Sequence, residues 1–267
     1  MRSFLFALLL APLAHAALEK ITPAKAPDWN GYEQVNFTVA GKAGLVVKPK
    51  HIAAGSPWIW RTEFFGHEPQ GDIALLEKGW HVAYFAISDM YGAPPAVDLM
   101  EKFDESVVSE FHLNKRVVLE GFSRGGLYAT QFAAAHPDQT AGLYLDAPVL
   151  DISSWPGGKG KGKGDAHCWQ QALAIYGLTE ETAKTFTGNP LDKAAALAKA
   201  KIPVLIVCGD ADTVVPYPEN AKPFEEKYKA AGGLIQVIVK PGGDHHPHSL
   251  KDPAPIVDFL LKNAVLK

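Results

Sequence analysis

One short stretch limits the folds open to this chain more than any other feature of its sequence. An aliphatic run over 117–119 leads into Gly121-Phe122-Ser123-Arg124-Gly125, and apolar residues at helical spacing then continue to Ala135. This pattern predicts a strand, a sharp turn and a helix, with the serine hydroxyl raised on the turn. Side chains in place of either glycine would collide in so tight a turn. The stretch therefore favours a nucleophilic serine, and the alternative is a glycine-rich turn in which Ser123 only caps the helix.

Strand-length apolar runs alternate with helical patterns along most of the 267 residues. Such alternation is typical of an α/β fold, with a mostly parallel central sheet covered by helices on both faces. Strands are predicted at 36–39, 43–48, 58–60, 81–86, 116–120, 141–145, 202–208 and 234–239, the first two as an antiparallel pair. Helices are predicted at 73–78, 97–111, 127–135, 218–231 and 255–266.

Residues 151–201 interrupt this alternation and predict a small cap insertion within the domain. They include an alternation of lysine and glycine over 159–164, which is flexible by composition, and a helical stretch over 169–176. The insertion's large aromatic residues either pack the cap or stack on a sugar or an aromatic ester: Trp155, Trp169 and Tyr176.

The first residues have the pattern of an export signal. Arg2 precedes an apolar run over 4–13, and Ala14-His15-Ala16 comes directly before Ala17. The apolar run is too short to span a bilayer. We therefore expect a signal peptide over 1–16, a single α/β domain over 17–267, a periplasmic or secreted protein, and no stable membrane anchor.

The balance of charge bears on whether the protein binds a nucleic acid. Lysine and arginine number 26 against 29 acidic residues, and no basic stripe with interleaved aromatic residues suggests nucleic-acid binding.

An exported protein could pair its two cysteines. Because Cys208 ends a predicted core strand and Cys168 lies in the insertion, we expect two free thiols, with Cys208 buried. Their spacing also excludes a zinc site built on cysteine.

A serine is a weak nucleophile until a base takes its proton, and the base needs an acid to orient it. The strand predicted at 202–208 is followed by Gly209-Asp210-Ala211-Asp212, so two acids compete. Asp212 lies farther into the loop and can reach over the sheet edge, whereas Asp210 suits a backbone hydrogen bond in the turn. The chain order Ser, Asp, His favours Asp212 as the acid. Asp146, after an earlier strand, is a weaker candidate.

Histidines cluster after the last predicted strand. The Gly242-Gly243 pair lets the chain turn there, and His245 is the first imidazole beyond it, which makes it the predicted base. His246 is the alternative, and His248 is expected to brace the loop or line the pocket. A metal site is a further alternative, since adjacent histidines can share a cation, but Asp244 is the only obvious additional ligand nearby. We therefore favour a base without a metal.

The order Ser123, Asp212, His245, with an elbow and an intervening cap, resembles the α/β-hydrolase family over about residues 36–266. The resemblance implies acyl transfer in two steps. His245 would take the Ser123 proton, Asp212 would orient the imidazolium, and the backbone N–H of Arg124 would bind the oxyanion. This chemistry needs no cofactor.

Two segments depart from the usual pattern of that family. Pro241-Gly242-Gly243-Asp244-His245 matches Pro-Gly-x-Gly-His except for its aspartate, which keeps His246 open as the base. Arg61-Thr62-Glu63 stands where the family usually has His-Gly, so we expect the second oxyanion N–H from near Glu63. Arg61 is alternatively a structural cation paired with a carboxylate.

The resemblance implies an ester substrate more often than a peptide. We therefore predict a secreted serine carboxylesterase that acts on an acylated carbohydrate or a similar small ester, although a fold alone does not choose a substrate. One alternative is a serine peptidase similar to the prolyl-oligopeptidase group. Those enzymes usually carry a large extra domain and bind the substrate amino terminus with acidic residues, and we recognise neither feature. The other alternative is a non-catalytic binding protein, which would not need the Ser, Asp and His set.

Overall fold

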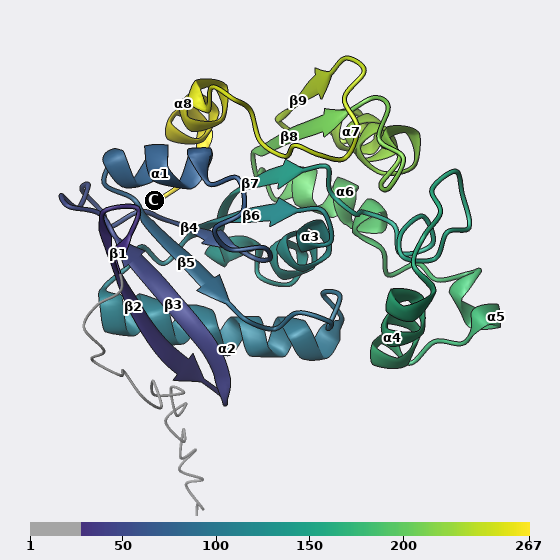
Figure 1. Cartoon of the computed structure of the whole chain (residues 1–267), viewed down its shortest axis with the longest axis horizontal. Helices are drawn as coiled ribbons and strands as arrows, with labels where there is room; N and C mark the ends of the chain where they lie inside the picture. Colours follow the sequence, from purple (N-terminus) through teal and green to yellow (C-terminus); the bar gives the residue numbers. More distant parts are fainter. Residues whose placement is uncertain (1–27) are drawn as a thin grey trace, which may run out of the picture.

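A nine-stranded sheet organises residues 28–267, the part of the chain that the computed structural model describes (Figure 1). The export signal expected over 1–16 lies outside the described residues. The sheet order is β1-β2-β3-β5-β4-β6-β7-β8-β9. The strands are β1 Asp28–Trp29, β2 Tyr32–Val39, β3 Lys42–Lys48, β4 Trp58–Arg61, β5 His81–Phe85, β6 Val117–Phe122, β7 Thr140–Asp146, β8 Val204–Gly209 and β9 Ile235–Lys240.

The sheet is antiparallel at one side and parallel over the rest, as the sequence predicts. Strands β1, β2, β3 and β5 pair antiparallel in that order, whereas β5, β4, β6, β7, β8 and β9 pair parallel. Every residue of β6, β7 and β8 is buried. Their near-continuous apolar sequence follows from this burial, because both faces of a parallel sheet are covered. The carboxyl ends of the parallel strands therefore share one edge of the sheet.

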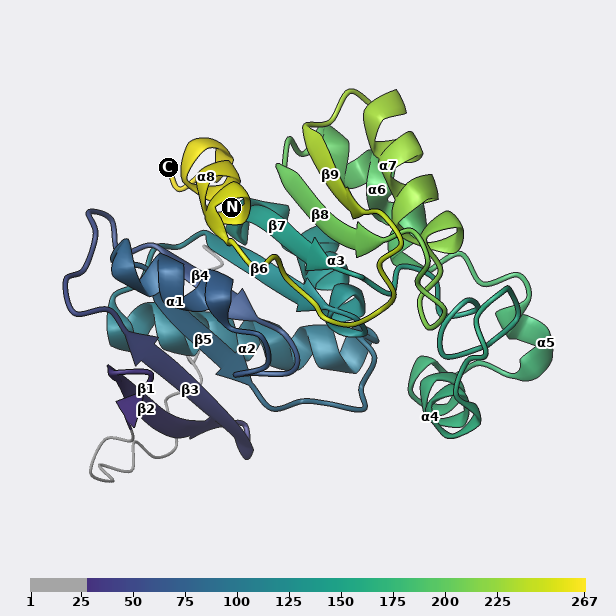
Figure 2. The same ribbon diagram turned by 45° about the horizontal axis from the view of Figure 1, so that its top comes forward.

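Helices form a layer on each face of the sheet, which confirms the predicted α/β fold (Figures 1 and 2). Helices α1 and α8 pack with one apolar cluster on one face, and α2, α3, α6 and α7 pack with another cluster on the opposite face. The helices are α1 Gln70–Glu77, α2 Pro94–Phe111, α3 Gly125–Ala135, α4 Ala166–Tyr176, α5 Glu180–Ala183, α6 Pro190–Lys199, α7 Ala221–Ala230 and α8 Ala254–Asn263.

Several boundaries differ from the sequence prediction for local reasons. Helix α2 begins three residues earlier than expected because Pro94 and Pro95 occupy its first turn, where the missing N–H costs nothing. The helix expected over 218–231 is divided, since a short 3-10 turn at Tyr217–Glu219 precedes α7. Strand β1 is only two residues long, too short to give an alternating pattern.

An aromatic cluster joins the elbow helix and α2 to the sheet. The Trp60 ring on β4 lies 4.7 Å from Phe103 of α2 and 5.4 Å from Phe132 of α3, measured between centroids. Phe85 on β5 lies 4.6 Å from Phe103. Pairs of this kind contribute about 0.5–1.5 kcal/mol each beyond the burial of their area. They hold α3, and with it the turn before α3, in a fixed place above the sheet.

The segment over 151–201 has two structurally distinct parts. Helices α4 and α5 lie beyond the carboxyl ends of the strands, away from the sheet (Figure 1), whereas α6 packs against α3 and α7 within the helical layer. The tyrosine hydroxyl of Tyr176 donates to the Tyr91 carbonyl at 2.8 Å, and the Trp169 indole donates to Glu180 at 2.7 Å. The Trp155 ring lies 6.3 Å from that of Tyr91. These aromatic residues therefore pack α4 and α5 together and onto the loop after β5.

Both cysteines are free thiols, as the sequence predicts. Cys208 is buried at the end of β8, and Cys168 is half-buried on α4. Burial raises the pKa of the Cys208 thiol to about 12, so this thiol stays protonated and unreactive near neutral pH.

Asp104 on α2 is a buried carboxylate that folding does not compensate. Its side chain is 4% exposed, and Oδ1 has no hydrogen-bond partner among the described residues. Burial, with Glu105 and Glu101 nearby, raises the pKa of Asp104 to about 8. An unfolded aspartate has a pKa of about 3.9. Between these values the folded state retains a proton that the unfolded state releases, so Asp104 destabilises the fold progressively as pH rises through this range.

We expect Asp104→Asn to raise the free energy of unfolding by about 1–3 kcal/mol at about pH 8, and by much less at about pH 5. Urea denaturation at the two pH values measures the difference. Glu110→Gln, at an exposed position of the same helix, is the control and should change little at either pH. An equal gain at both pH values would contradict the charge argument.

Candidate active site

Ser123 occupies a strained turn between β6 and α3. Its backbone φ is +49°, a left-handed conformation that is uncommon for a residue with a side chain. A Cβ on Gly121 would lie 2.8 Å from the Gly125 carbonyl oxygen, so the turn closes only with glycine there. The Ser123 N–H donates to the Asp146 carbonyl, and the Ser123 carbonyl accepts from Val149 N–H, both at 2.9 Å. Strand β7 and the loop after it thereby hold the backbone conformation of Ser123 in place.

The structure brings the predicted serine, histidine and aspartate together at the carboxyl edge of the sheet. His245 Nε2 lies 3.0 Å from Ser123 Oγ, and His245 Nδ1 lies 2.8 Å from Asp212 Oδ2. Ser123, Asp212 and His245 are 8%, 6% and 5% exposed. Because a carboxylate only accepts, Nδ1 carries the proton, and Nε2 is left to accept from the serine hydroxyl. The arrangement is that of a nucleophile, a base and an orienting acid.

The Asp212 carboxylate is held by the loop that carries it. Its Oδ1 accepts from the backbone N–H groups of Val214 and Val215 at 2.8 and 2.7 Å. Asp210, the competing acid, accepts instead from Gly242 N–H at 2.6 Å and shapes the adjoining turn. Both roles agree with the order of preference drawn from the sequence.

Asp244, which departs from the usual glycine of the α/β-hydrolase pattern, joins two loops of the site. Its Oδ1 accepts from the backbone N–H of Thr213 at 2.9 Å and from that of His245 at 2.8 Å. These hydrogen bonds lower the pKa of the Asp244 carboxyl. The aspartate therefore ties the loop of the histidine to the loop of Asp212.

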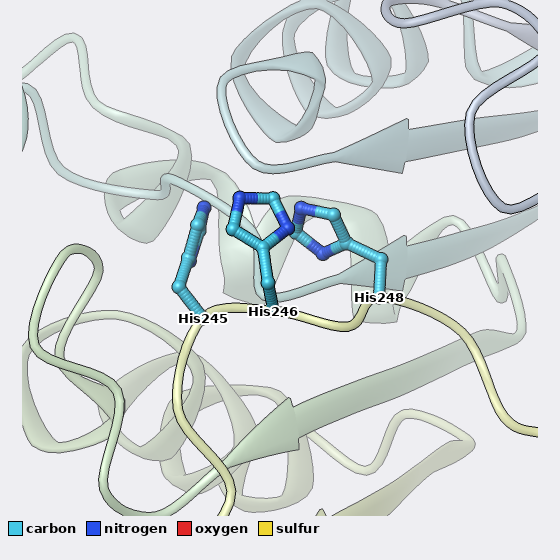
Figure 3. A group of neighbouring side chains, drawn as sticks. All are labelled: His245, His246 and His248. Carbon is cyan, nitrogen blue, oxygen red and sulfur yellow. The ribbon is translucent and has the colours of Figure 1, made fainter.

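The three histidine side chains lie next to one another on the loop after β9 (Figure 3). Of these three, His245 is the one hydrogen bonded to Ser123. The ring centroids of His246 and His248 lie 4.9 and 4.8 Å from that of His245. His248 is buried, and its Nδ1 lies 3.0 Å from Asp146 Oδ1. His246 is exposed, and desolvation together with the neighbouring histidines lowers its pKa. His248 thus both braces the loop and lines the pocket.

Asp146, the weakest acid candidate from the sequence, serves His248 rather than His245. It is fully buried at the end of β7. Its Oδ2 accepts from the Tyr144 hydroxyl at 2.9 Å and from the Ser249 N–H at 2.8 Å. The site therefore contains a second buried histidine–aspartate pair, which the sequence does not reveal because its members are 102 residues apart in the chain.

Two backbone amides are available for an oxyanion. The Thr62 hydroxyl donates to the Gly125 carbonyl at 2.9 Å and ties the loop after β4 to the elbow. A Cβ on Gly125 would lie 3.6 Å from Glu63 N. Among the described residues, neither the Glu63 nor the Arg124 N–H has a hydrogen-bond acceptor. Arg124 caps α3, so the helix N-terminus adds its partial positive charge there. Both N–H groups therefore stay candidates for the two oxyanion donors predicted from the sequence.

The side chains of these two residues also pair with each other. Arg124 Nε lies 3.4 Å from Glu63 Oε1, and the Ser88 hydroxyl donates to Glu63 Oε2 at 3.0 Å. Burial raises the pKa of Glu63, although Arg124 opposes that shift. The contact fixes the loop after β4 against the start of α3. It therefore supports the position of both backbone amides.

Arg61 is a structural cation, the alternative that the sequence left open. Its guanidinium is fully buried, hydrogen bonded to Asp72 and 3.8 Å from Glu120. It also lies 4.1 Å over the Phe122 ring. Asp72 compensates a charge that would otherwise be costly to bury. Burial and the adjacent Asp72 raise the pKa of Glu120 well above its usual range.

A cavity of ≈330 Å³ opens beside the serine. Among the described residues, its lining contains no carboxylate and consists of Phe64, Phe65, His67, Ser123, His245, His246 and His248. The sequence did not mark Phe64, Phe65 or His67, although two phenylalanines directly after a predicted central strand are a usable signal. A larger hollow of ≈690 Å³ between α7, β9 and α8 contains none of the triad residues.

The family model described as "Prolyl oligopeptidase family" matches residues 78–265, which include the elbow and both partner loops. The chain belongs to the prolyl oligopeptidase family. Members are serine hydrolases with the α/β-hydrolase fold, so the predicted fold and the serine hydrolase class are confirmed. Comparison with curated proteins gives no match.

Three solved structures similar to this family member are peptidases. Acylaminoacyl peptidase of Pyrococcus horikoshii is 16% identical with a TM-score of 0.65, over 87% of this chain and 42% of that one. Dipeptidyl peptidase 4 of Porphyromonas gingivalis is 16% identical with a TM-score of 0.66, over 87% of this chain and 35% of that one. A puromycin-hydrolyzing peptidase of Mycobacterium tuberculosis is 14% identical with a TM-score of 0.62, over 85% of this chain and 38% of that one. The chain thus spans about two fifths of the length of these structures, and the likeness establishes the fold.

Proposed function

We propose that this protein is a serine peptidase that cleaves amide bonds through an acyl-enzyme, with Ser123, His245 and Asp212 as its catalytic triad. The observation that carries the proposal is the hydrogen-bond chain from Asp212 Oδ2 through His245 to Ser123 Oγ, at 2.8 and 3.0 Å. Two amides without acceptors lie beside the same elbow. A protein that only binds a ligand would need neither this hydrogen-bond chain nor the two amides.

The geometry supports each step of the reaction. Ser123 Oγ attacks the carbonyl carbon while His245 Nε2 takes its proton, and Asp212 stabilises the imidazolium that forms. The N–H groups of Arg124 and Glu63 donate to the developing oxyanion. His245 then returns the proton to the leaving nitrogen, and water releases the acyl group by the same route in reverse.

Support for an amide rather than an ester comes from the comparisons. The sequence alone favoured an ester, possibly of an acylated carbohydrate. Both the family and the similar structures are instead those of peptidases. The aromatic residues for which stacking on a sugar was one alternative pack the insertion and its contact with the loop after β5, and none lines the cavity beside Ser123.

The cavity beside Ser123 indicates an uncharged acyl group. A buried ammonium group needs a carboxylate partner. The described lining of this cavity has none, and the nearby Glu63 already pairs with Arg124. Glu68 lies outside this lining, and its Oε2 accepts from the His248 N–H. We therefore propose a blocked peptide with an apolar residue on the acyl side of the bond. An uncharged ester of the same acyl group fits equally well, so ester hydrolysis is the second candidate.

A matched substrate set tests the proposal. N-acetyl-phenylalanine p-nitroanilide and the p-nitrophenyl ester of the same acid share one acyl group and differ only in the leaving atom. We expect turnover of both, and loss of both in Ser123→Ala. Turnover of the ester alone would instead favour the carboxylesterase predicted from the sequence. Preference for the unblocked phenylalanine anilide would contradict an uncharged acyl group, and tight binding without turnover would favour the binding protein.

We also propose that residues 1–16 direct export, which would place Ala17 at the mature amino terminus. Within residues 28–267, no helix is long and apolar enough to cross a bilayer. We further propose that the protein acts on a small-molecule substrate and has no nucleic-acid partner. The intact mass of exported protein tests the cleavage site, and retention of Met1 would contradict it.

A further inference from the structure

A second set of potential ligands, outside the triad, includes two residues that line the cavity. His67 and Glu68 belong to the loop between β4 and α1, and His246 belongs to the loop after β9. One ligand atom from each of the three lies within 4.8 Å of the other two. The His67 and His246 rings have centroids 5.8 Å apart. Two distant segments of the chain thus present two imidazoles and a carboxylate to one point.

The lone pairs of this set are free to bind a cation. Among residues 28–267, no hydrogen bond is found to a ring nitrogen of His246 or of His67. The Glu68 carboxylate lies 3.5 Å from His67 Nε2. Glu68 Oε2 accepts from the His248 N–H at 2.6 Å, which leaves Oε1 unused. That hydrogen bond also joins the two loops, so it holds the carboxylate close to His246.

The neighbouring histidine trio is a poorer site, although its ligand atoms also lie within 4.8 Å of one another. Both nitrogens of His245 are used, one by Asp212 and the other by Ser123. His248 uses Nδ1 for Asp146. A cation bound by His245, His246 and His248 would therefore have to break the triad, whereas His67, Glu68 and His246 can bind one without doing so.

We propose that His67, Glu68 and His246 bind a zinc ion. Two imidazoles and one carboxylate with an open fourth position are a ligand set that zinc accepts, and imidazole ligands favour zinc over magnesium or calcium. Tetrahedral coordination needs ligand atoms about 3.4 Å apart. The His67 side chain is 52% exposed and His246 is also exposed, so rotation of these rings can close the remaining gap.

Zinc at this position inhibits the enzyme by competing with substrate. His67 and His246 line the same cavity as Ser123, so an ion held between them occupies the space next to the nucleophile. The inhibition rests on the proposed function, whereas the binding of zinc does not. The two can therefore be tested separately.

Binding is tested on the full chain by calorimetric titration with Zn²⁺ and by the visible absorption of bound Co²⁺. We expect one zinc per chain, and at least a tenfold loss of affinity in each of His67→Gln, Glu68→Gln and His246→Gln. His51→Gln, an exposed histidine outside the cluster, is the matched control and should bind normally. His245→Gln should also retain zinc. Circular dichroism of each variant separates lost binding from lost folding.

Three results would overturn the proposal. The first is the absence of Zn²⁺ binding to the folded chain. The second is binding that survives both His67→Gln and Glu68→Gln. The third is binding that disappears in His245→Gln but persists in His67→Gln, which would place the ion on the triad. For inhibition, zinc should raise KM without lowering kcat, and Glu68→Gln should weaken inhibition by the same factor as binding. If no substrate is turned over at all, the titrations still decide whether the site exists.

Discussion

Replacing Ser123 by alanine should lower kcat by roughly a million-fold while leaving the melting temperature nearly unchanged. The substitution removes the attacking oxygen, and neither His245 nor any other group at the elbow can take its place. What remains is the small acceleration that an oxyanion site and substrate binding provide without a nucleophile. Stability should change little, because the alanine keeps the backbone hydrogen bonds that hold residue 123 against β7 and the loop after it.

Hydrolysis of the acetyl-phenylalanine ester measures this loss. Ser109→Ala, an exposed serine on α2, is the control and should keep full activity. A phosphonate inhibitor should label Ser123 of the wild-type chain, as located by peptide mass spectrometry. Recovery of the label on another serine would contradict the assignment of the nucleophile.

The elbow could be predicted from the sequence because its causes are local. The tight contact of Gly121 with the Gly125 carbonyl involves residues four positions apart, so the Gly-x-Ser-x-Gly spacing records it directly. The positions of Asp212 and His245 follow from one further step. In a parallel sheet, loops after neighbouring strands meet at one edge, so loops after β8 and β9 could be expected over the serine.

The remaining parts of the site depend on pairings between distant segments. The buried contacts of His248 with Asp146, and of Arg61 with Asp72 and Glu120, join residues that no local pattern connects. The zinc ligands proposed above likewise come from separate loops. A single sequence gives the residue types at these positions but not their partners, because the partner is set by the register of the sheet.

Substrate class was also beyond local reasoning. The sequence resemblance extended to the whole α/β-hydrolase fold, in which esterases are common, whereas the family match restricts the chain to the prolyl oligopeptidase family. We expect the lining of the cavity to select the acyl group, and Phe64 and His67 contribute to that lining from a loop. Phe64 has a φ of +55°, a conformation that sequence periodicity does not indicate. A loop of this kind determines which acyl groups fit but leaves no repeating pattern.

The second large effect is expected at the base. His245→Ala should lower kcat/KM by about 10⁴- to 10⁶-fold, because the serine then has no proton acceptor. His246→Ala and His248→Ala should each cost only about tenfold to a hundredfold, through loosened geometry in the cavity. The reason is that His245 alone contacts both Ser123 and Asp212. The ester and the anilide should lose activity in parallel, because both need the same proton transfer.

Stability must be measured beside activity in this series, since the three histidines differ in burial. His248→Ala leaves Oδ1 of the fully buried Asp146 without its imidazole partner, and leaving a buried acceptor unsatisfied typically costs about 1–3 kcal/mol. We therefore expect the melting temperature to fall most for His248→Ala, and His248→Gln should restore part of it by donating to the same carboxylate. His246→Ala, at an exposed position, should have a near-normal melting temperature.

The pattern across the series distinguishes three mechanisms. A deep loss confined to His245 supports the triad. A deeper loss of kcat/KM in His246→Ala would identify His246 as the base. The loop after β9 would then have to rotate to bring that ring between Ser123 and Asp212. A deep loss at all three that added zinc reverses would make the histidines ligands of a catalytic ion. Because the structure engages both nitrogens of His245 within the triad, that last result would contradict the triad and the inhibitory zinc site together.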